Sequence, residues 1–324
     1  MIDTKTVFIL GAGSSKPYGY PVGWELKDEI IKKFGNYYKE LIKVDKPGFR
    51  SMRPKLKRYY NDMMPKFIDA LKRSNPDTSI DLFLSRNQVF ADIGKLAIAM
   101  IILRSEITGT FRNSGYNPNE DWCSYLIRRM TEDLSAPDGF VKYKENKVSF
   151  ITFNYDRSFD YCIYDRFIHD FGSIQDPENS ASKFIPFPII HVYGILSRLP
   201  WQEKNKYAYR RATGASDQNN AFYDFEMIES MSKNIRIIQE RVNDEDIGAA
   251  KKLIEAANRI YFLGFGYADE NLQVLGFPEI IGDKSVFGTV QGFTENEIGR
   301  VVKKVTTGKR PMKQMNTTSE LVVS

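Results

Sequence analysis

One stretch near the start of this 324-residue chain, Val7 to Gly13, constrains its fold more than any other. Four consecutive large apolar residues predict a strand buried on both faces, which is typical of the first strand in a parallel sheet. Gly11 and Gly13 then predict a tight turn, and a helical pattern opens near Trp24. Because glycines let a backbone approach an anion closely and a helix start offers unpaired N–H groups, this segment predicts a phosphate-binding site. The alternative is a tight strand-to-helix turn with no ligand.

The turn differs from the two best-known nucleotide-binding motifs. The dinucleotide fingerprint has a third glycine where this chain has Lys16, and no Gly-Lys-Ser/Thr follows at the spacing of a Walker loop. Two hydroxyl side chains, Ser14 and Ser15, follow the glycines instead. We expect them to contact a phosphate, to cap the first helix, or to do both. The residues expected to bind phosphate are Gly11, Ala12, Gly13, Ser14 and Ser15.

Composition and charge narrow the class of protein. The 42% apolar and 27% charged fractions are those of an ordinary globular protein. No apolar block approaches the roughly 20 residues that span a bilayer, and no export signal is recognisable, so we expect a cytoplasmic protein with no membrane contact. The net charge of +5 suits an anionic ligand, but scattered Lys and Arg do not predict direct nucleic-acid binding.

The two cysteines of the chain, Cys123 and Cys162, lie far apart in the sequence on helical patterns. We interpret them as reduced core residues of a cytoplasmic protein. Because the chain has no Cys-x-x-Cys pair, the sequence predicts no zinc site, and we expect no metal.

Strand patterns lie near the two ends of the chain, and helical patterns lie between them. Further strands are expected at residues 148–153, 189–194, 259–263 and 286–290. We therefore predict a discontinuous α/β domain with a Rossmann-like parallel sheet, formed by residues 1–34 and 146–305. A helical insertion module of residues 35–145 and a basic, flexible tail of residues 306–324 complete the chain.

Helical periodicity predicts an amphipathic helix over residues 23–34 that ends at Gly35. Residues 93–106 are apolar nearly all round, which predicts the buried central helix of the insertion module. Apolar residues between Met227 and Val242 recur at helical spacing and predict one long helix. Local signals also predict helix caps at Ser79 or Asp81 and a capping box at residues 294–297.

Polar residues or glycines follow four of the predicted strands. These segments are Gly11–Ser15, Thr152–Asp156, His191–Gly194 and Gly264–Tyr267. Because open α/β sheets bind ligands beyond the carboxyl ends of their strands, we expect the four segments to meet at one ligand. For Asn154 and Asp156 the alternative is a cap on the following helix. The alternative for His191 is a hydrogen-bonded histidine in the core. The alternative for residues 264–267 is an ordinary turn with no ligand.

The same segments resemble the sirtuin superfamily in their order along the chain. Residues 11–15 resemble its Gly-Ala-Gly-x-Ser signature, and the Gly-Tyr-Pro that follows stands where that family has Gly-Ile-Pro. Residues 152–156, Thr-Phe-Asn-Tyr-Asp, are similar to its Thr-Gln-Asn-x-Asp, and His191 to its catalytic histidine near a glycine. Residues 264–266 take the place of its Gly-Thr-Ser. The resemblance covers the predicted sheet domain and not the helical insertion.

Two features of sirtuin deacylases are missing. Val-Gly-Trp at residues 22–24 replaces their Asp-Phe-Arg, and the four zinc-binding cysteines are absent. The chain is therefore more similar to the bacterial sirtuin-like NADases of antiphage defence, which have helices in place of the zinc module. Members of that group deplete NAD on infection, and some assemble with a HerA-type ATPase.

This resemblance implies a sirtuin-type fold and an NAD⁺ glycohydrolase that releases nicotinamide and ADP-ribose as a toxic effector of abortive infection. It implies NAD⁺ as the substrate, a homo-oligomer, and a HerA-type ATPase as a partner. The residues that it assigns to catalysis are Asn154, Asp156 and His191. Besides residues 11–15, those that it assigns to NAD⁺ binding are Thr152, Gly264 and Gly266.

The chemistry of these residue types fits that activity. Nicotinamide leaves NAD⁺ as a neutral group, so the barrier lies in the oxocarbenium-like ribosyl cation and in delivering a nucleophile to it. Asn154 can hold a ribose hydroxyl or a water, and Asp156 can accept a bond from the carboxamide and favour the developing positive charge. His191 can act as the general base, because histidine is the side chain that most often does so at neutral pH.

Three other functions remain open. A non-catalytic sensor of NAD or an NAD-derived nucleotide needs the phosphate site but not His191 and Asn154. An NAD-dependent protein deacylase should release nicotinamide only with an acyl-lysine peptide. A nucleic-acid-binding subunit would need a one-sided basic surface, which the sequence does not suggest.

Overall fold

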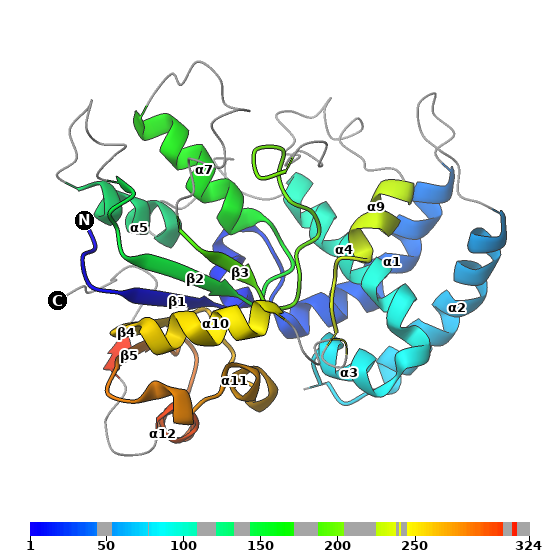
Figure 1. Cartoon of the computed structure of the whole chain (residues 1–324). Helices are drawn as coiled ribbons and strands as arrows, with labels where there is room; N and C mark the ends of the chain where they lie inside the picture. Colours follow the sequence, from blue (N-terminus) through cyan, green and yellow to red (C-terminus); the bar gives the residue numbers. More distant parts are fainter. Residues whose placement is uncertain are drawn as a thin grey trace.

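The strands form one parallel sheet in the order β3-β2-β1-β4-β5-β6, the doubly wound arrangement typical of dinucleotide-binding folds. This computed structural model (Figure 1) describes residues 1–43, 54–76, 78–108, 121–132, 143–171, 187–203, 225–237, 240, 245–306 and 313–315. The strands are β1 (Thr6–Leu10), β2 (Val148–Thr152), β3 (Ile189–His191), β4 (Arg259–Leu263), β5 (Ser285–Thr289) and β6 (Lys313–Met315). The prediction of an α/β fold with a Rossmann-like parallel sheet is confirmed.

The strand register brings the predicted site segments to one edge. Leu10 at the end of β1 is paired with Thr152 on one side and with Leu263 on the other. Thr152 is in turn paired with His191 on β3. The order of the strands reverses between β1 and β4, and the crevice at such a reversal is where open α/β sheets bind their ligands.

Helices cover both faces of the sheet (Figure 1), which explains why β1 is buried along its whole length. Helices α5 (Trp122–Thr131) and α7 (Ser158–Phe171) lie on one face. Helices α10 (Glu245–Ala256), α11 (Asp269–Leu275) and α12 (Glu295–Val305) lie on the other. Within the sheet, the ring of Phe8 stacks between Phe150 and Tyr261 at centroid distances of 5.3 and 5.2 Å.

A second group of helices lies beyond the carboxyl ends of the strands (Figure 1). It consists of α1 (Gly23–Lys43), α2 (Pro54–Arg73), α3 (Ile80–Arg86), α4 (Ala91–Thr108) and α9 (Phe225–Ser232). Helix α4 is its centre, and residues 96–99 on four successive sides of this helix are all 0% exposed, as predicted. Single 3-10 turns are η1 (Ala12–Ser14), η2 (Lys16–Tyr18), η3 (Gln88–Phe90) and η5 (Glu279–Ile281). The described residues between β1 and β2 form helices only, while the division into domains stays a prediction.

The local cap signals are confirmed. The Ser79 hydroxyl accepts a hydrogen bond from the N–H of Leu82 and caps α3. Thr294 and Glu297 form the predicted capping box at the start of α12.

Two helix predictions are wrong. Helix α1 does not end at Gly35 but continues to Lys43, because packing of residues such as Tyr38 outweighs the cost of about 1 kcal/mol that glycine imposes on a helix interior. The predicted long helix from Met227 ends as α9 at Ser232. Ile235 and Ile237 are buried outside any helix, and the N–H of Arg236 between them donates to the carbonyl of Tyr193.

The C-terminal tail is described only in part. Lys313–Met315 form β6 and pair with β5 at the edge of the sheet, which the prediction of an unstructured tail missed. The rest of the predicted tail beyond Thr306 lies outside the described residues.

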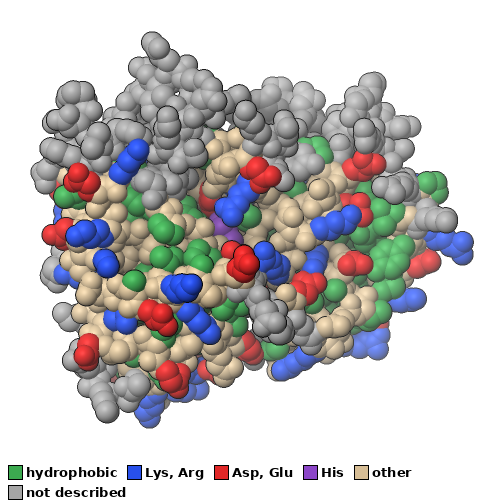
Figure 2. All heavy atoms as spheres, viewed as in Figure 1, with side chains coloured by type: hydrophobic (Ala, Val, Ile, Leu, Met, Phe, Trp, Pro, Cys, Tyr) green, Lys and Arg blue, Asp and Glu red, His purple; other side chains and the backbone are tan. Residues whose placement is uncertain are grey.

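On the molecular face shown in Figure 2, Lys and Arg side chains are interspersed with Asp and Glu among the coloured residues, and they do not gather into one basic patch. None of the helices described here is long and apolar enough to cross a membrane.

Candidate functional site

A cavity of about 1290 Å³ opens at the point where the strand order reverses. One wall is formed by the ends of β1, β2 and β4, with residues 11–14, 153–156 and 263–266. The opposite wall comes from the helices: residues 78–81 at the start of α3, and several residues of α5 from Trp122 onward. The cavity is large enough for a dinucleotide, since sites for drug-sized ligands occupy about 300–1,000 Å³.

The glycines at this edge are explained by contact between two loops. Gly13 donates its N–H to the carbonyl of Gly264 at 2.9 Å, and a Cβ on Gly11 would lie 2.5 Å from the same oxygen. Gly264 has a φ of +56°, and a Cβ there would lie 2.0 Å from Ser14 N. Close backbone packing therefore requires these three glycines with or without a ligand. Gly266 lines the cavity with open space around its Cα.

Asn154 connects the end of β2 to the turn that follows β1 (residues 11–15, the β1 turn). Its Nδ2 lies 3.0 Å from the Gly11 carbonyl, 3.0 Å from Ser15 Oγ and 3.2 Å from Ser14 Oγ, and it donates toward them. The predicted binding residue Thr152 does not line the cavity; its hydroxyl accepts from the Asn154 N–H at 3.1 Å and thereby positions Asn154.

The side-chain amide oxygen of Asn154, Oδ1, is buried and has no hydrogen-bond partner among the described residues. Asn154 is 8% exposed and lines the cavity. A buried acceptor without a partner costs about 1–3 kcal/mol, so such an atom in a native site points to a ligand or water that satisfies it.

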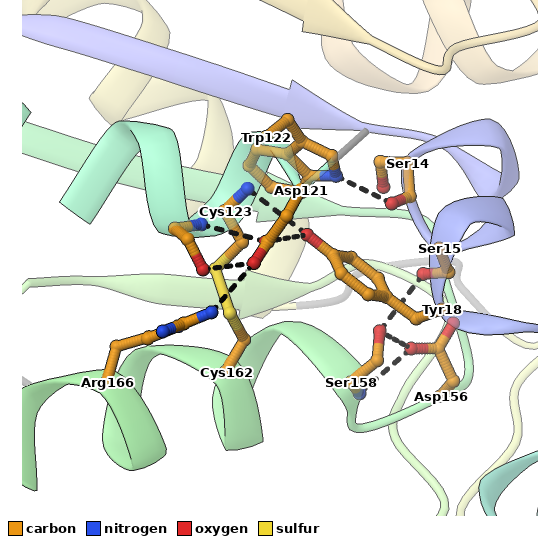
Figure 3. Close-up of a disulfide and its surroundings, with 11 residues drawn as sticks. Ser14, Ser15, Tyr18, Asp121, Trp122, Cys123, Asp156, Ser158, Cys162 and Arg166 are labelled. Carbon is orange, nitrogen blue, oxygen red and sulfur yellow. Dashed lines mark hydrogen bonds and ion pairs between the residues drawn. A yellow bond between two sulfur atoms is a disulfide. The ribbon is translucent and has the colours of Figure 1, made fainter. Parts of the chain in front are cut away.

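Asp156 both caps a helix and lines the cavity. Its Oδ1 accepts from the Ser158 N–H at 2.9 Å and from the Ser158 hydroxyl, so the capping alternative is realised for Asp156 and not for Asn154. The Ser158 hydroxyl also lies 3.2 Å from that of Ser15, which connects α7 to the β1 turn (Figure 3). Burial raises the pKa of Asp156 above its ordinary value, and the hydrogen bonds from Ser158 offset only part of that increase.

His191 lies behind Asn154, outside the cavity wall. It is 5% exposed, its Nε2 is 3.0 Å from Asp160 Oδ2, and its Nδ1 is 3.4 Å from the Asn154 carbonyl oxygen. Asp160 also accepts from Gln202 Nε2 at 2.6 Å. Burial raises the pKa of Asp160, but the interactions with His191 and Gln202 outweigh it, so the net shift is downward. This geometry is that of a hydrogen-bonded buried histidine that touches the site through the Asn154 backbone.

Several residues of the cavity wall were not found from the sequence. The Trp122 Nε1 donates to the Ser14 carbonyl at 2.7 Å (Figure 3). The Trp122 ring stacks on Phe159. The Tyr155 hydroxyl donates to Asp81 Oδ1 across the cavity wall. No local signal marks these contacts, since each joins segments far apart in the sequence. Trp24, 67% exposed, lines the cavity at the start of α1.

The two cysteines are buried in the core as predicted, but the prediction that they are reduced is wrong. Cys123 on α5 and Cys162 on α7 form a disulfide, with a Cα–Cα distance of 6.7 Å (Figure 3). They meet because α5 and α7 pack side by side on one face of the sheet. Disulfides are usual in oxidising compartments, so the cysteines no longer support a cytoplasmic location.

No protein-family model matches the sequence, and no curated protein shows significant similarity to it. Within the described parts of the chain, no group of three or more His, Cys, Asp and Glu side chains is arranged to hold a metal ion.

Proposed function

We propose that this protein is an NAD⁺ glycohydrolase of the sirtuin-like NADase type. The observation that carries the proposal is the unpaired, buried Oδ1 of Asn154 in a cavity of dinucleotide size, where the strand order reverses. The resemblance of residues 11–15, 152–156 and 264–266 to the sirtuin motifs supports it, because these segments line or support that cavity.

In this proposal the β1 turn and residues 264–266 bind the pyrophosphate. The binding energy of the pyrophosphate then serves to orient the reacting ribose. Asn154 Oδ1 accepts a hydrogen bond from a ribose hydroxyl or from the attacking water. Asp156 lies near the nicotinamide, accepting a bond from its carboxamide and, when ionised, favouring the ribosyl cation. The C1′–N bond breaks as a water oxygen bonds to C1′; nicotinamide leaves neutral and the water loses a proton to solvent.

His191 has a different role in this proposal from the general base suggested by its residue type. Because neither the ring nor its neighbour Asp160 lines the cavity, we assign His191 to holding the Asn154 backbone in place. A water in the cavity can then lose its proton without a side-chain base, since the cation that it attacks is highly reactive.

The test is incubation of the purified chain with NAD⁺, with quantification of nicotinamide and ADP-ribose. Asn154→Ala should lower kcat at least about 100-fold, the usual effect of removing a group that stabilises the transition state. Asn36→Ala is the matched control, because Asn36 is exposed on α1 and does not line the cavity. Nicotinamide release that requires an acyl-lysine peptide would identify a deacylase instead.

A non-catalytic NAD sensor is the second candidate, and the position of His191 outside the cavity favours it. A sensor would bind NAD⁺ and leave it intact in every condition, and His191→Ala should leave that binding unchanged. Calorimetric titration with NAD⁺, run beside the hydrolysis assay, separates the two functions.

The proposed biological role is that of a toxic effector in antiphage defence, controlled by homo-oligomerisation and by a HerA-type ATPase partner. This part of the proposal rests on the resemblance alone. Repeating the hydrolysis assay with extract of phage-infected cells tests it, since an effector that must be silent in healthy cells should gain activity there.

A further inference from the structure

The loop between β2 and α7 contacts two different parts of the protein with alternate residues. Asn154 and Asp156 hydrogen-bond toward the β1 turn and the start of α7. Tyr155 and Arg157 instead bond acidic side chains on α3 and α4. Each of the two proposed site residues is therefore followed by a residue that the helical group holds.

The Arg157 contact is a fully buried ion pair. Its Nη2 lies 2.6 and 2.9 Å from the two carboxylate oxygens of Glu106, and its Nε lies 3.1 Å from Oε2. The side chains are 0% and 1% exposed. Removing one partner of such a pair leaves an uncompensated buried charge, so this contact anchors α4 to the loop and its loss is expected to impair folding.

The contact of Tyr155 is a hydrogen bond instead of a buried ion pair, and it lies at the cavity. The Tyr155 hydroxyl donates to Asp81 Oδ1, and both residues line the cavity. Asp81 is the second residue of α3, directly after the Ser79 cap region. The Tyr155 ring also packs against Tyr193, with centroids 5.9 Å apart, so removing only the hydroxyl leaves its packing in place.

We propose that Tyr155 and Asp81 are positioning residues, through which α3 sets the placement of Asn154 and Asp156 for catalysis. This inference rests on the proposed function and assigns the control of that site to the helical group. Because Tyr155 shares peptide bonds with both site residues, a shift of α3 must move their backbone. Among the described residues no hydrogen bond joins α3 to the glycine turns that bind the pyrophosphate in this proposal, so binding should be spared.

The expected result is a loss in kcat with KM preserved. Tyr155→Phe and Asp81→Ala should each lower kcat for NAD⁺ hydrolysis about tenfold, since small misplacements of reacting groups cost one to two powers of ten. KM should stay within about twofold of the wild type, because the binding contacts remain. Combining both changes should cost no more than either alone, as expected for two ends of one contact.

Two variants control for other effects. Asp81→Asn retains an oxygen that accepts from the Tyr155 hydroxyl and should restore most of kcat. Tyr261→Phe removes a buried hydroxyl that has no hydrogen-bond partner among the described residues and lies outside the cavity, so it should leave kcat unchanged. Wild-type kcat in Tyr155→Phe, or a raised KM instead of a lowered kcat, would overturn the proposal.

Amide hydrogen exchange gives a readout that does not depend on catalysis. Tyr155→Phe should speed exchange in the peptide covering residues 153–158 and leave the β4 peptide unchanged. Unchanged exchange in residues 153–158 would refute the positioning role even if the enzyme is active. Absence of NAD⁺ hydrolysis in the wild type would refute the proposed function but not the positioning role. The hydrogen-exchange result would still decide whether α3 holds this loop.

Discussion

The N–H of Gly13 donates a hydrogen bond to the carbonyl of Gly264, across the point where the strand order of the sheet reverses. The loops after β1 and β4 are thereby joined backbone to backbone at the base of the cavity. Both loops line the cavity, so we expect this contact to affect both stability and ligand binding.

Gly264→Ala should destabilise the protein by about 2–4 kcal/mol, because φ is +56° and the new Cβ would lie 2.0 Å from Ser14 N. Gly266→Ala is the matched control, since nothing lies within 4 Å of a Cβ there. Urea denaturation measures both free energies of unfolding. Equal effects of the two substitutions would contradict the role of the close contact.

Asp156→Asn should raise the melting temperature at neutral pH and abolish activity. Burial raises the pKa of Asp156, so the folded wild type loses stability as pH rises from the ordinary value of 3.8 through the raised pKa. The amide mimics the neutral carboxyl, and its oxygen can still accept from the Ser158 N–H. The difference in melting temperature between variant and wild type should disappear when both are measured below the ordinary pKa. A variant less stable than the wild type at every pH would contradict this expectation.

His191→Gln distinguishes a positioning residue from a general base. Glutamine retains an N–H for Asp160, so a positioning role predicts a loss of less than about tenfold in kcat. A general base would instead be worth about 10²–10⁴-fold in kcat. A loss in that larger range would show that the ring reaches the cavity during catalysis.

If the proposed NAD⁺ hydrolysis is correct, Glu270 should make the protein prefer NAD⁺ over NADP⁺. Its carboxylate lies at the start of α11 and lines the cavity beyond the Gly264 turn. There it can accept from ribose hydroxyls and repel a 2′-phosphate. Glu270→Gln should reduce the ratio of kcat/KM for NAD⁺ to that for NADP⁺ about tenfold, as removal of one like-charge repulsion predicts. Glu295→Gln, at an exposed position outside the cavity, serves as the control and should leave the ratio unchanged.

Reduction of the Cys123–Cys162 disulfide should lower the free energy of unfolding by about 2–4 kcal/mol, as expected for a link across 39 residues of sequence. Urea denaturation with and without a thiol reductant measures the loss, and the double variant Cys123→Ser, Cys162→Ser should not respond to the reductant. Alkylation of two thiols in the native, unreduced protein would contradict the disulfide.

Local patterns predicted those elements whose stability comes from their own residues. The apolar run before Gly11 forms a buried strand, because such a run is stable only when both of its faces are covered. Thr294 forms its capping box, because the hydrogen bonds of the box lie within one helical turn. The same reasoning failed at Gly35 and after Ser232, where packing against distant segments decided whether the helix continued.

The sequence by itself determined the parallel sheet, the buried helix α4 and the set of polar strand ends at one edge, since runs of apolar residues and apolar periodicity follow from burial. The order of the strands came only from the structure. Only the tertiary structure decided which strand-end residues face the cavity. It turned Asn154 and Asp156 toward the β1 turn, placed His191 behind them, and brought Asp81 to Tyr155. These outcomes depend on contacts between segments that meet only when the chain has folded, and no local pattern of residues encodes such contacts.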